Sequence, residues 1–254
     1  MAGHSKWANI RHRKERQDKK KGKVWSKCSR AIMAAARQGG TDPATNLTLR
    51  YAIEEAKSEN MPKDTIQRAI DKGGGASDGQ EFTEISYEGY GPSGVAILID
   101  ALTDNRTRTV NDVRTAFSKH GGNVGTPGSV SYMFQTRGQI YVPAAGVEED
   151  HIMEAALEAG ADDVQPPEDP TPEDAGVWTI STEPTELLNV REALEGAGFE
   201  IADAEIAKIP DNTVSLTAED AQKQLKLIDV LEDNDDVQKV YHNADIPEEA
   251  YAGA

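Results

Sequence analysis

The hydrophobic pattern of this chain of 254 residues changes from helical to strand-like at a glycine-rich stretch, Gly73 to Gly79. Before that stretch, apolar residues recur at the three- and four-residue intervals of amphipathic helices. After it, short apolar runs bounded by turn residues alternate with further helical segments. Because the two patterns occupy separate parts of the chain, we expect an α+β protein with an N-terminal helical bundle.

Three short helices are predicted in the first part of the chain. The first covers residues 24–35, and its apolar side chains fall within roughly 120° of the helix surface. Asp42 and Pro43 make a suitable N-cap and first turn for the second helix. The third begins near Pro62 and ends at the glycines. Brief connections between the helices favour a three-helix bundle.

Two small α/β units of the split βαβ, ferredoxin-like kind are predicted after the linker, and one is inserted in the other. The outer unit has strands 82–88, 95–102, 129–134 and 237–242, a helix that starts at a capping box of Thr109 and Asp112, and a helix over 218–231.

The inserted unit has its own strands and helices between the two halves of the outer one. Its predicted elements are strands 139–142, 163–165, 177–181 and 199–209 and helices 148–158 and 185–195. An acidic, proline-rich run over 166–176 is expected to be a loop. The predicted domains are a basic bundle, 1–78, a discontinuous α/β domain, 79–134 and 210–245, an inserted α/β domain, 135–209, and a tail, 246–254.

Charge is strongly segregated along the chain. Residues 1–37 hold 12 Lys and Arg against Glu15 and Asp18, a local charge of +10, although the whole chain carries −17. The other 217 residues therefore carry −27. Such a basic end on an acidic protein is typical of a docking surface for a polyanion, above all nucleic acid. Lys and Arg would neutralise phosphates and release counterions, so that affinity falls as salt rises.

The candidate contacts with nucleic acid are the basic residues of this segment and one tryptophan. In and next to the first predicted helix, four of these cations fall within roughly 80° on the side opposite the apolar face, which a solvated basic tail would not require. The predicted set is Lys6, Trp7, Arg11, Arg13, Lys14, Lys19, Lys20, Lys21, Lys23, Lys27, Arg30 and Arg37. A secondary cleft site is predicted at Asn105, Arg106 and Arg108, where a helix N-terminus could help to bind an anion.

Patterns typical of catalysis or of cofactors are missing from the sequence. The five histidines never fall at metal-ligand spacing, and no P-loop glycine pattern occurs. Cys28 is the one cysteine and lies among apolar residues, so we expect a buried thiol in a reducing, cytoplasmic setting. No apolar stretch is long enough for a membrane span. We expect a chain that is not an enzyme and needs no cofactor.

Several ordered motifs resemble those of the YebC/PmpR family. They are MAGHSKWANIRHRK at 1–14, AARQGG at 35–40, NMPKD at 60–64, YEGYGP at 87–92, TDNRTRT at 103–109, KHGGN at 119–123 and GSVSYMF at 128–134. The resemblance implies a helical bundle with two α/β domains around a cleft, and a transcriptional regulator that binds DNA. The family is also similar to a mitochondrial translational activator, and bacterial relatives have been linked to the ribosome.

The residues themselves favour a different nucleic acid from the family label. No predicted helix shows the cluster of Asn, Gln and Arg that a major-groove reader needs, so the basic segment fits phosphates better than bases. Ribosomal or messenger RNA, and the ribosome, are therefore the alternative partners. A protein-interaction scaffold that uses the acidic α/β domains is a second alternative. The sequence does not indicate an oligomeric state.

Overall fold

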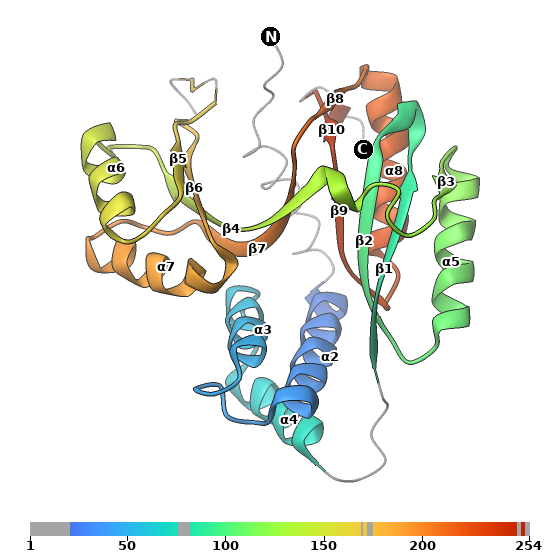
Figure 1. Cartoon of the computed structure of the whole chain (residues 1–254), viewed down its shortest axis with the longest axis horizontal. Coiled ribbons are helices and arrows are strands. Elements are labelled where there is room, and N and C mark those ends of the chain that lie inside the picture. The colour runs from blue at the N-terminus through green and yellow to red at the C-terminus, as the bar shows by residue number, and fades with distance from the viewer. Residues whose placement is uncertain (1–20, 76–81, 169, 172–174, 248–249, 252–254) are drawn as a thin grey trace. The chain divides into compact units, whose positions relative to one another are not determined.

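The computed structural model describes residues 21–75, 82–168, 170–171, 175–247 and 250–251. Within them the chain is α+β, with an N-terminal helical region and two antiparallel sheets with helices (Figure 1). The described residues form two compact units. One consists of 21–131 and 222–242, and the other of 132–221 and 243–251. Each unit is described here by itself.

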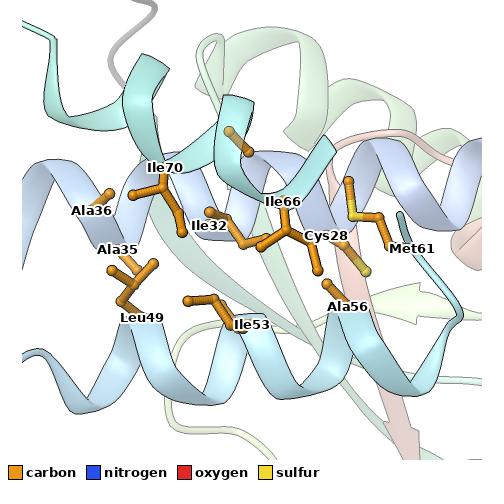
Figure 2. Packing of buried hydrophobic residues seen from close by; sticks show 12 residues of the cluster. Cys28, Ile32, Ala35, Ala36, Leu49, Ile53, Ala56, Met61, Ile66 and Ile70 are labelled. Atoms are coloured by element: carbon orange, nitrogen blue, oxygen red, sulfur yellow. The ribbon is translucent and has the colours of Figure 1, made fainter. Parts of the chain in front are cut away.

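The helical region belongs to the first unit and confirms the three predicted helices. They are α2 (Lys21–Gly39), α3 (Leu47–Ser58) and α4 (Lys63–Gly74). Figure 2 shows their apolar faces meeting in one core, in which Ile32 and Leu49 are fully buried. The core cluster consists of Cys28, Ile32, Ala35, Ala36, Leu49, Ala52, Ile53, Ala56, Met61, Ile66, Ala69 and Ile70.

The start of α3 differs from the prediction. Asn46, and not Asp42, is its N-cap, and the side-chain oxygen of Asn46 accepts a hydrogen bond from the Leu49 amide at 3.0 Å. The amide nitrogen of the same side chain donates to the carbonyls of Ala35 and Gly40. Asp42 instead stabilises the preceding turn by accepting from the Ala44 amide. Asn46 is the N-cap in place of Asp42 because its side chain bonds both the start of α3 and the end of α2.

The first sheet has four strands in the order β3-β1-β2-β9, paired antiparallel throughout (Figure 1). In the inner strand β2, all residues except Asp100 are buried, because both faces of this strand are covered. Helix α5 follows the first two strands and α8 precedes the last. The elements are β1 (Thr83–Tyr90), β2 (Ala96–Thr103), α5 (Arg106–Lys119), β3 (Asn123–Val124), α8 (Ala218–Glu232) and β9 (Val237–His242).

Helix α5 packs tightly on this sheet through Phe117 and Val113, which are both buried. A Cβ atom at Gly89 would lie 2.7 Å from the ring of Phe117, so only glycine allows this close approach. The predicted capping box at Thr109 is wrong: α5 begins one turn earlier, and Asn105 caps it by accepting from the Arg108 amide at 3.0 Å. Thr109 is a buried residue inside the helix.

A strand over residues 129–134 was also expected, and it is not formed. Glu88 is buried on β1, and its carboxylate accepts hydrogen bonds from the backbone amides of Gly128, Val130 and Ser131 at 2.6–2.8 Å. Burial opposes ionisation of Glu88, but these donors hold its pKa below the ordinary value. The amides that a strand would need are therefore used by a carboxylate, and residues 131–133 form a short 3-10 helix.

The second unit contains a four-stranded sheet in the order β5-β6-β4-β7, again antiparallel. Its helices and strands occur where the sequence predicted them, although β4 begins earlier and β7 later. They are β4 (Phe134–Pro143), α6 (Glu149–Glu158), β5 (Asp163–Gln165), β6 (Val177–Thr182), α7 (Leu187–Gly196) and β7 (Asp203–Pro210), with a small parallel pair of β8 (Val214–Ser215) and β10 (Ala244–Asp245).

None of the helices among the described residues is both long enough and apolar enough to cross a membrane.

The bundle core provides a matched pair of leucines on α3 for a stability test. Leu49 is 0% exposed and Leu47 is 38% exposed. Leu49→Ala should lower the free energy of unfolding of the bundle by about 2–5 kcal/mol, since it leaves a cavity in a packed core. Leu47→Ala should cost clearly less. Urea denaturation followed by circular dichroism measures both; equal losses would contradict the packing in Figure 2.

Candidate nucleic-acid interface

The predicted contact residues are divided between a described and an undescribed part of the chain. Helix α2 carries five of them: Lys21, Lys23, Lys27, Arg30 and Arg37. The other seven lie outside the described residues, and these are Lys6, Trp7, Arg11, Arg13, Lys14, Lys19 and Lys20.

Helix α2 has the two faces that its sequence predicts. Its apolar side enters the bundle core with Cys28, whose thiol is buried; burial raises the pKa of Cys28 to about 12, which makes it a poor nucleophile. Trp25 packs against the same core and donates its indole N–H to the carbonyl of Glu59 at 3.0 Å. Four of the five basic residues, all except Lys21, therefore lie on the side of α2 that faces away from the core.

That basic side is not fully free, because part of it contacts an acidic segment of the same compact unit. We call this segment, which joins the end of α8 to the start of β9, the acidic loop. It consists of Glu232, Asp233, Asn234, Asp235 and Asp236.

Three cations, one turn apart along α2, bind the acidic loop. Lys23 Nζ lies 2.8 Å from a carboxylate oxygen of Asp233. Lys27 Nζ donates to the backbone carbonyl at position 232 at 2.6 Å. Arg30 donates to the carbonyl at position 235 and to the carboxylate of Asp236 at 3.2 Å. The basic stripe of α2 therefore binds anionic and carbonyl oxygens within its own chain.

Solvent exposure limits the strength of these contacts. The side chain of Lys23 is 45% exposed and that of Asp233 is 46% exposed, so their ion pair contributes about 0–1 kcal/mol and weakens as salt rises. Lys27 is more buried. Desolvation lowers its pKa, and the nearby carboxylates of Glu232 and Asp235 only partly offset this effect.

A buried carboxylate, Asp236, connects the acidic loop to the secondary site predicted near α5. Asp236 is 3% exposed, and Arg108 donates to it through Nη2 at 2.7 Å and through Nε at 3.1 Å. The hydroxyl groups of Thr103 and Thr109 also donate to it. Burial opposes ionisation of Asp236, but the hydrogen bonds from Arg108 and Thr109 outweigh it and hold the pKa below its ordinary value.

The three residues of the predicted secondary site have three different environments. Asn105 caps α5. Arg108 is held by Asp236 and, at 2.8 Å, by Asp104, so its charge is already neutralised. Arg106 is exposed and makes no hydrogen bond or ion pair with any described residue. Of the three, Arg106 alone presents an uncompensated charge at this helix end.

Sequence reasoning missed the acidic loop as a partner of α2. The signal was present, because four acidic residues lie within 232–236, but acidic residues are also common at helix ends. The contacts join residues about 205 positions apart, and no local pattern indicates such a pairing. Within the described ranges, no group of three or more His, Cys, Asp or Glu side chains could hold a metal ion.

Asp236 offers a direct test of this network. Asp236→Asn removes the charge that Arg108 and Thr109 stabilise, and should lower the free energy of unfolding by about 2–3 kcal/mol at pH 7. Asp235→Asn is the control, because its side chain is 61% exposed, and should cost less than about 0.5 kcal/mol. Urea denaturation measures both.

The stability difference between the natural chain and Asp236→Asn should also depend on pH, in a direction that the pKa of Asp236 fixes. The pKa of Asp236 is lowered in the folded state, so its contribution is present above its unfolded pKa, near 4, and is lost as pH falls through the lower folded value. The stability gap between the natural chain and Asp236→Asn should therefore close below pH 4. A gap that is independent of pH would contradict the carboxylate network.

Family models and relatives cover nearly the whole chain. A model described as the TACO1/YebC protein N-terminal domain matches residues 5–76, and one described as the TACO1/YebC second and third domain matches residues 82–244. The transcriptional regulatory protein PmpR of Pseudomonas aeruginosa is 56% identical over 252 residues, 99% of each chain. A probable transcriptional regulatory protein of Pseudomonas syringae is 56% identical over 249 residues, 98% of each chain.

A solved structure shows the same fold. It is the crystal structure of a conserved hypothetical protein, Aq1575, from Aquifex aeolicus, which is 48% identical and matches with a TM-score of 0.76. The match covers 89% of this chain and 90% of that one. The α+β architecture of the described residues agrees with it. Two family models that together span most of the chain, and relatives identical at more than half of their positions, show that this chain belongs to the TACO1/YebC family.

Proposed function

We propose that this chain is a DNA-binding regulator of gene expression that works without catalysis and holds the phosphate backbone through its basic N-terminal region. The observation that carries this function is the charge segregation: +10 on residues 1–37 against −27 on the rest. Because the core of the bundle takes up the apolar side of α2, the cations of that helix are left on a surface. A surface of this kind fits a polyanion.

The names of the relatives favour DNA among the polyanions. The similar proteins from Pseudomonas are named transcriptional regulatory proteins, and regulation of transcription requires contact with DNA or with a protein bound to it. The translational alternative has no comparable support among these names, so binding to RNA enters as an outcome of the tests. Such a regulator would act in the cytoplasm.

The distribution of charge also orients the complex. Residues 1–78, the proposed nucleic-acid-binding domain, would contact phosphates, whereas the acidic α/β domains, 79–134 with 210–245 and 135–209, would be repelled from them. Screening limits this repulsion to about 8–10 Å at physiological salt. The α/β domains would therefore face away from DNA wherever basic side chains do not hold them close.

The described contacts of α2 add a step to binding. Lys23, Lys27 and Arg30 already bind oxygens of the acidic loop, so a phosphate must replace these oxygens before it can use the three cations. At Lys23 the exchange costs little, since its ion pair with Asp233 is partly exposed and weak, whereas Arg30 must leave the buried carboxylate of Asp236. The acidic loop therefore lowers the affinity for DNA. Because the cations give up oxygens of the acidic loop as they gain phosphates, a multivalent polyanion is favoured over isolated anions.

Charge reversal of Lys20, Lys21 and Lys23 tests the proposed function. The triple change to Glu should weaken binding of a fluorescent 20-base-pair duplex by at least about a hundredfold at 100 mM salt, since it replaces three phosphate contacts with three repulsive charges. Fluorescence anisotropy measures the affinity. Circular dichroism should show unchanged helix content, because Lys21 and Lys23 are exposed.

A matched control separates surface contact from net charge. Lys57, Lys63 and Lys72 are exposed on α3 and α4, and their reversal to Glu changes the net charge by the same amount. This control should weaken binding much less. Equal weakening by both triples, or unchanged affinity in the first, would contradict binding through the N-terminal surface. Stronger binding of a structured RNA than of the duplex would favour the translational alternative. If the chain binds neither nucleic acid, a protein-interaction scaffold is favoured.

The competition by the acidic loop makes a separate prediction. Asp233→Asn with Asp235→Asn should raise affinity for the same duplex about three- to tenfold, because two weak ion pairs with α2 no longer compete. The control is Glu154→Gln with Glu158→Gln on α6, two exposed carboxylates that remove the same charge elsewhere. If both pairs change the affinity equally, the acidic loop acts only through net charge.

A further inference from the structure

Helix α5 differs in charge from the other helices of the α/β regions. Among the described residues after the linker, it is the one helix in which basic residues outnumber acidic ones, four to one. Helix α6 has four acidic residues and no Lys or Arg, and α7 and α8 each have more acidic than basic residues. In a chain with 44 acidic residues, a basic helix on the acidic body needs its own explanation.

The exposed surface of α5 is free of carboxylates over a wide arc. The residues opposite the buried Phe117 and Val113 fall within about 140° of the helix surface. We call this surface the outer face of α5. Asp112 lies at its edge and accepts a hydrogen bond from Asn234 at 3.4 Å. The outer face consists of Thr107, Asn111, Arg114, Thr115, Ser118 and Lys119, all exposed; Arg108 projects into the same arc but is bound to Asp104 and Asp236.

The two cations of this face have no anionic partner in the described chain. Arg114 and Lys119 make no hydrogen bond or ion pair with any described residue. By contrast, Lys23, Arg30 and Arg108 of the same compact unit are all bound to carboxylates. An arginine that stays unpaired on so acidic a protein is available to an external anion.

The helix that carries this face is rigidly fixed. Phe117 packs against the sheet at Gly89, Asn105 caps the first turn, and Arg108 is held by the buried carboxylate of Asp236. A fixed helix loses little conformational entropy when its outer side chains bind a ligand. The polar residues between the two cations have short side chains, and no Glu or Asp stands among them to shield the positive charge.

We propose that the outer face of α5 is a second DNA-contact surface, shaped for the major groove of a duplex. The inference rests on the proposed function and adds a second surface to it. A helix of 14 residues, about 21 Å long, fits the major groove of B-form DNA. Arg114 and Lys119 then contact phosphates at the edges of the groove. The sequence lacks a cluster of Asn, Gln and Arg for base edges, so base contact here rests on the single amide of Asn111 at the centre, which pairs with an adenine edge, and on the Thr and Ser hydroxyls, which contact either base type.

The test uses the full chain with Arg114→Ala and Lys119→Ala together. Affinity for a 20-base-pair duplex at 100 mM salt should fall about tenfold. The slope of log K against log salt should become less steep by about 2, because two phosphate contacts are lost. The control is Lys223→Ala with Lys226→Ala, which removes the same charge from exposed positions on α8 and should leave the slope unchanged.

A second variant tests the groove contact itself. Asn111→Ala keeps the charge, so it should leave affinity for mixed-sequence DNA within about twofold but reduce the preference shown in selection from randomised duplexes. A-form RNA has a major groove too narrow for a helix, so the Arg114 and Lys119 changes should weaken binding to an RNA duplex less than binding to DNA.

The outcomes separate this inference from the proposed function. If reversal of Lys20, Lys21 and Lys23 abolishes DNA binding while the α5 double variant binds like its α8 control, the groove surface is refuted and the function stands. A loss of RNA binding alone on changing α5 would also refute it. If neither set of changes affects DNA binding, the proposed function itself is wrong.

Discussion

The buried carboxylate of Asp236 is the interaction on which the first compact unit depends most. It binds Arg108 and Thr109 of α5, Thr103 at the end of β2, and Arg30 of α2. One charged group therefore joins the helical bundle to the sheet and its covering helix, through residues that are more than 120 positions away in sequence. Leaving such a group unpaired inside a protein is costly, so its partners are fixed in position. The same network positions α5 and the basic side of α2, the two surfaces to which we assign DNA contact.

Local patterns predicted most of the fold, and failed where distant side chains decide the outcome. Helical spacing placed α2, α3 and α4, because apolar periodicity depends on residues within a few turns. The N-cap of α3 moved to Asn46 because that side chain also bonds the end of α2. The strand expected over 129–134 is replaced by a loop because Glu88, some 40 residues earlier, takes its amides. Neither competing partner is visible within a short window of sequence.

The sequence predicted which residues of α2 form its basic face, but not the ion pairs and hydrogen bonds that these residues make. Charge along the chain identified the basic face of α2, and the opposing Cys28 and Ile32 are buried as expected. The sequence did not show that Lys23, Lys27 and Arg30 bind the acidic loop, or that Arg108 is neutralised by Asp236. It also did not single out α5 as a helix with a carboxylate-free outer face, because that conclusion requires knowing which residues the sheet buries. Together these observations describe a protein whose own acidic loop already binds three of the cations that we propose for nucleic-acid contact.

The measurement that tests the central claim most directly is the salt dependence of binding between the unaltered full chain and duplex DNA. If about six of the 12 basic residues within positions 1–37 contact phosphates, log K should fall linearly with log salt with a slope of about −5. A slope that steep would establish that the complex is held by phosphate contacts and counterion release. A slope near zero, or binding that strengthens as salt rises, would contradict nucleic-acid binding through the basic region.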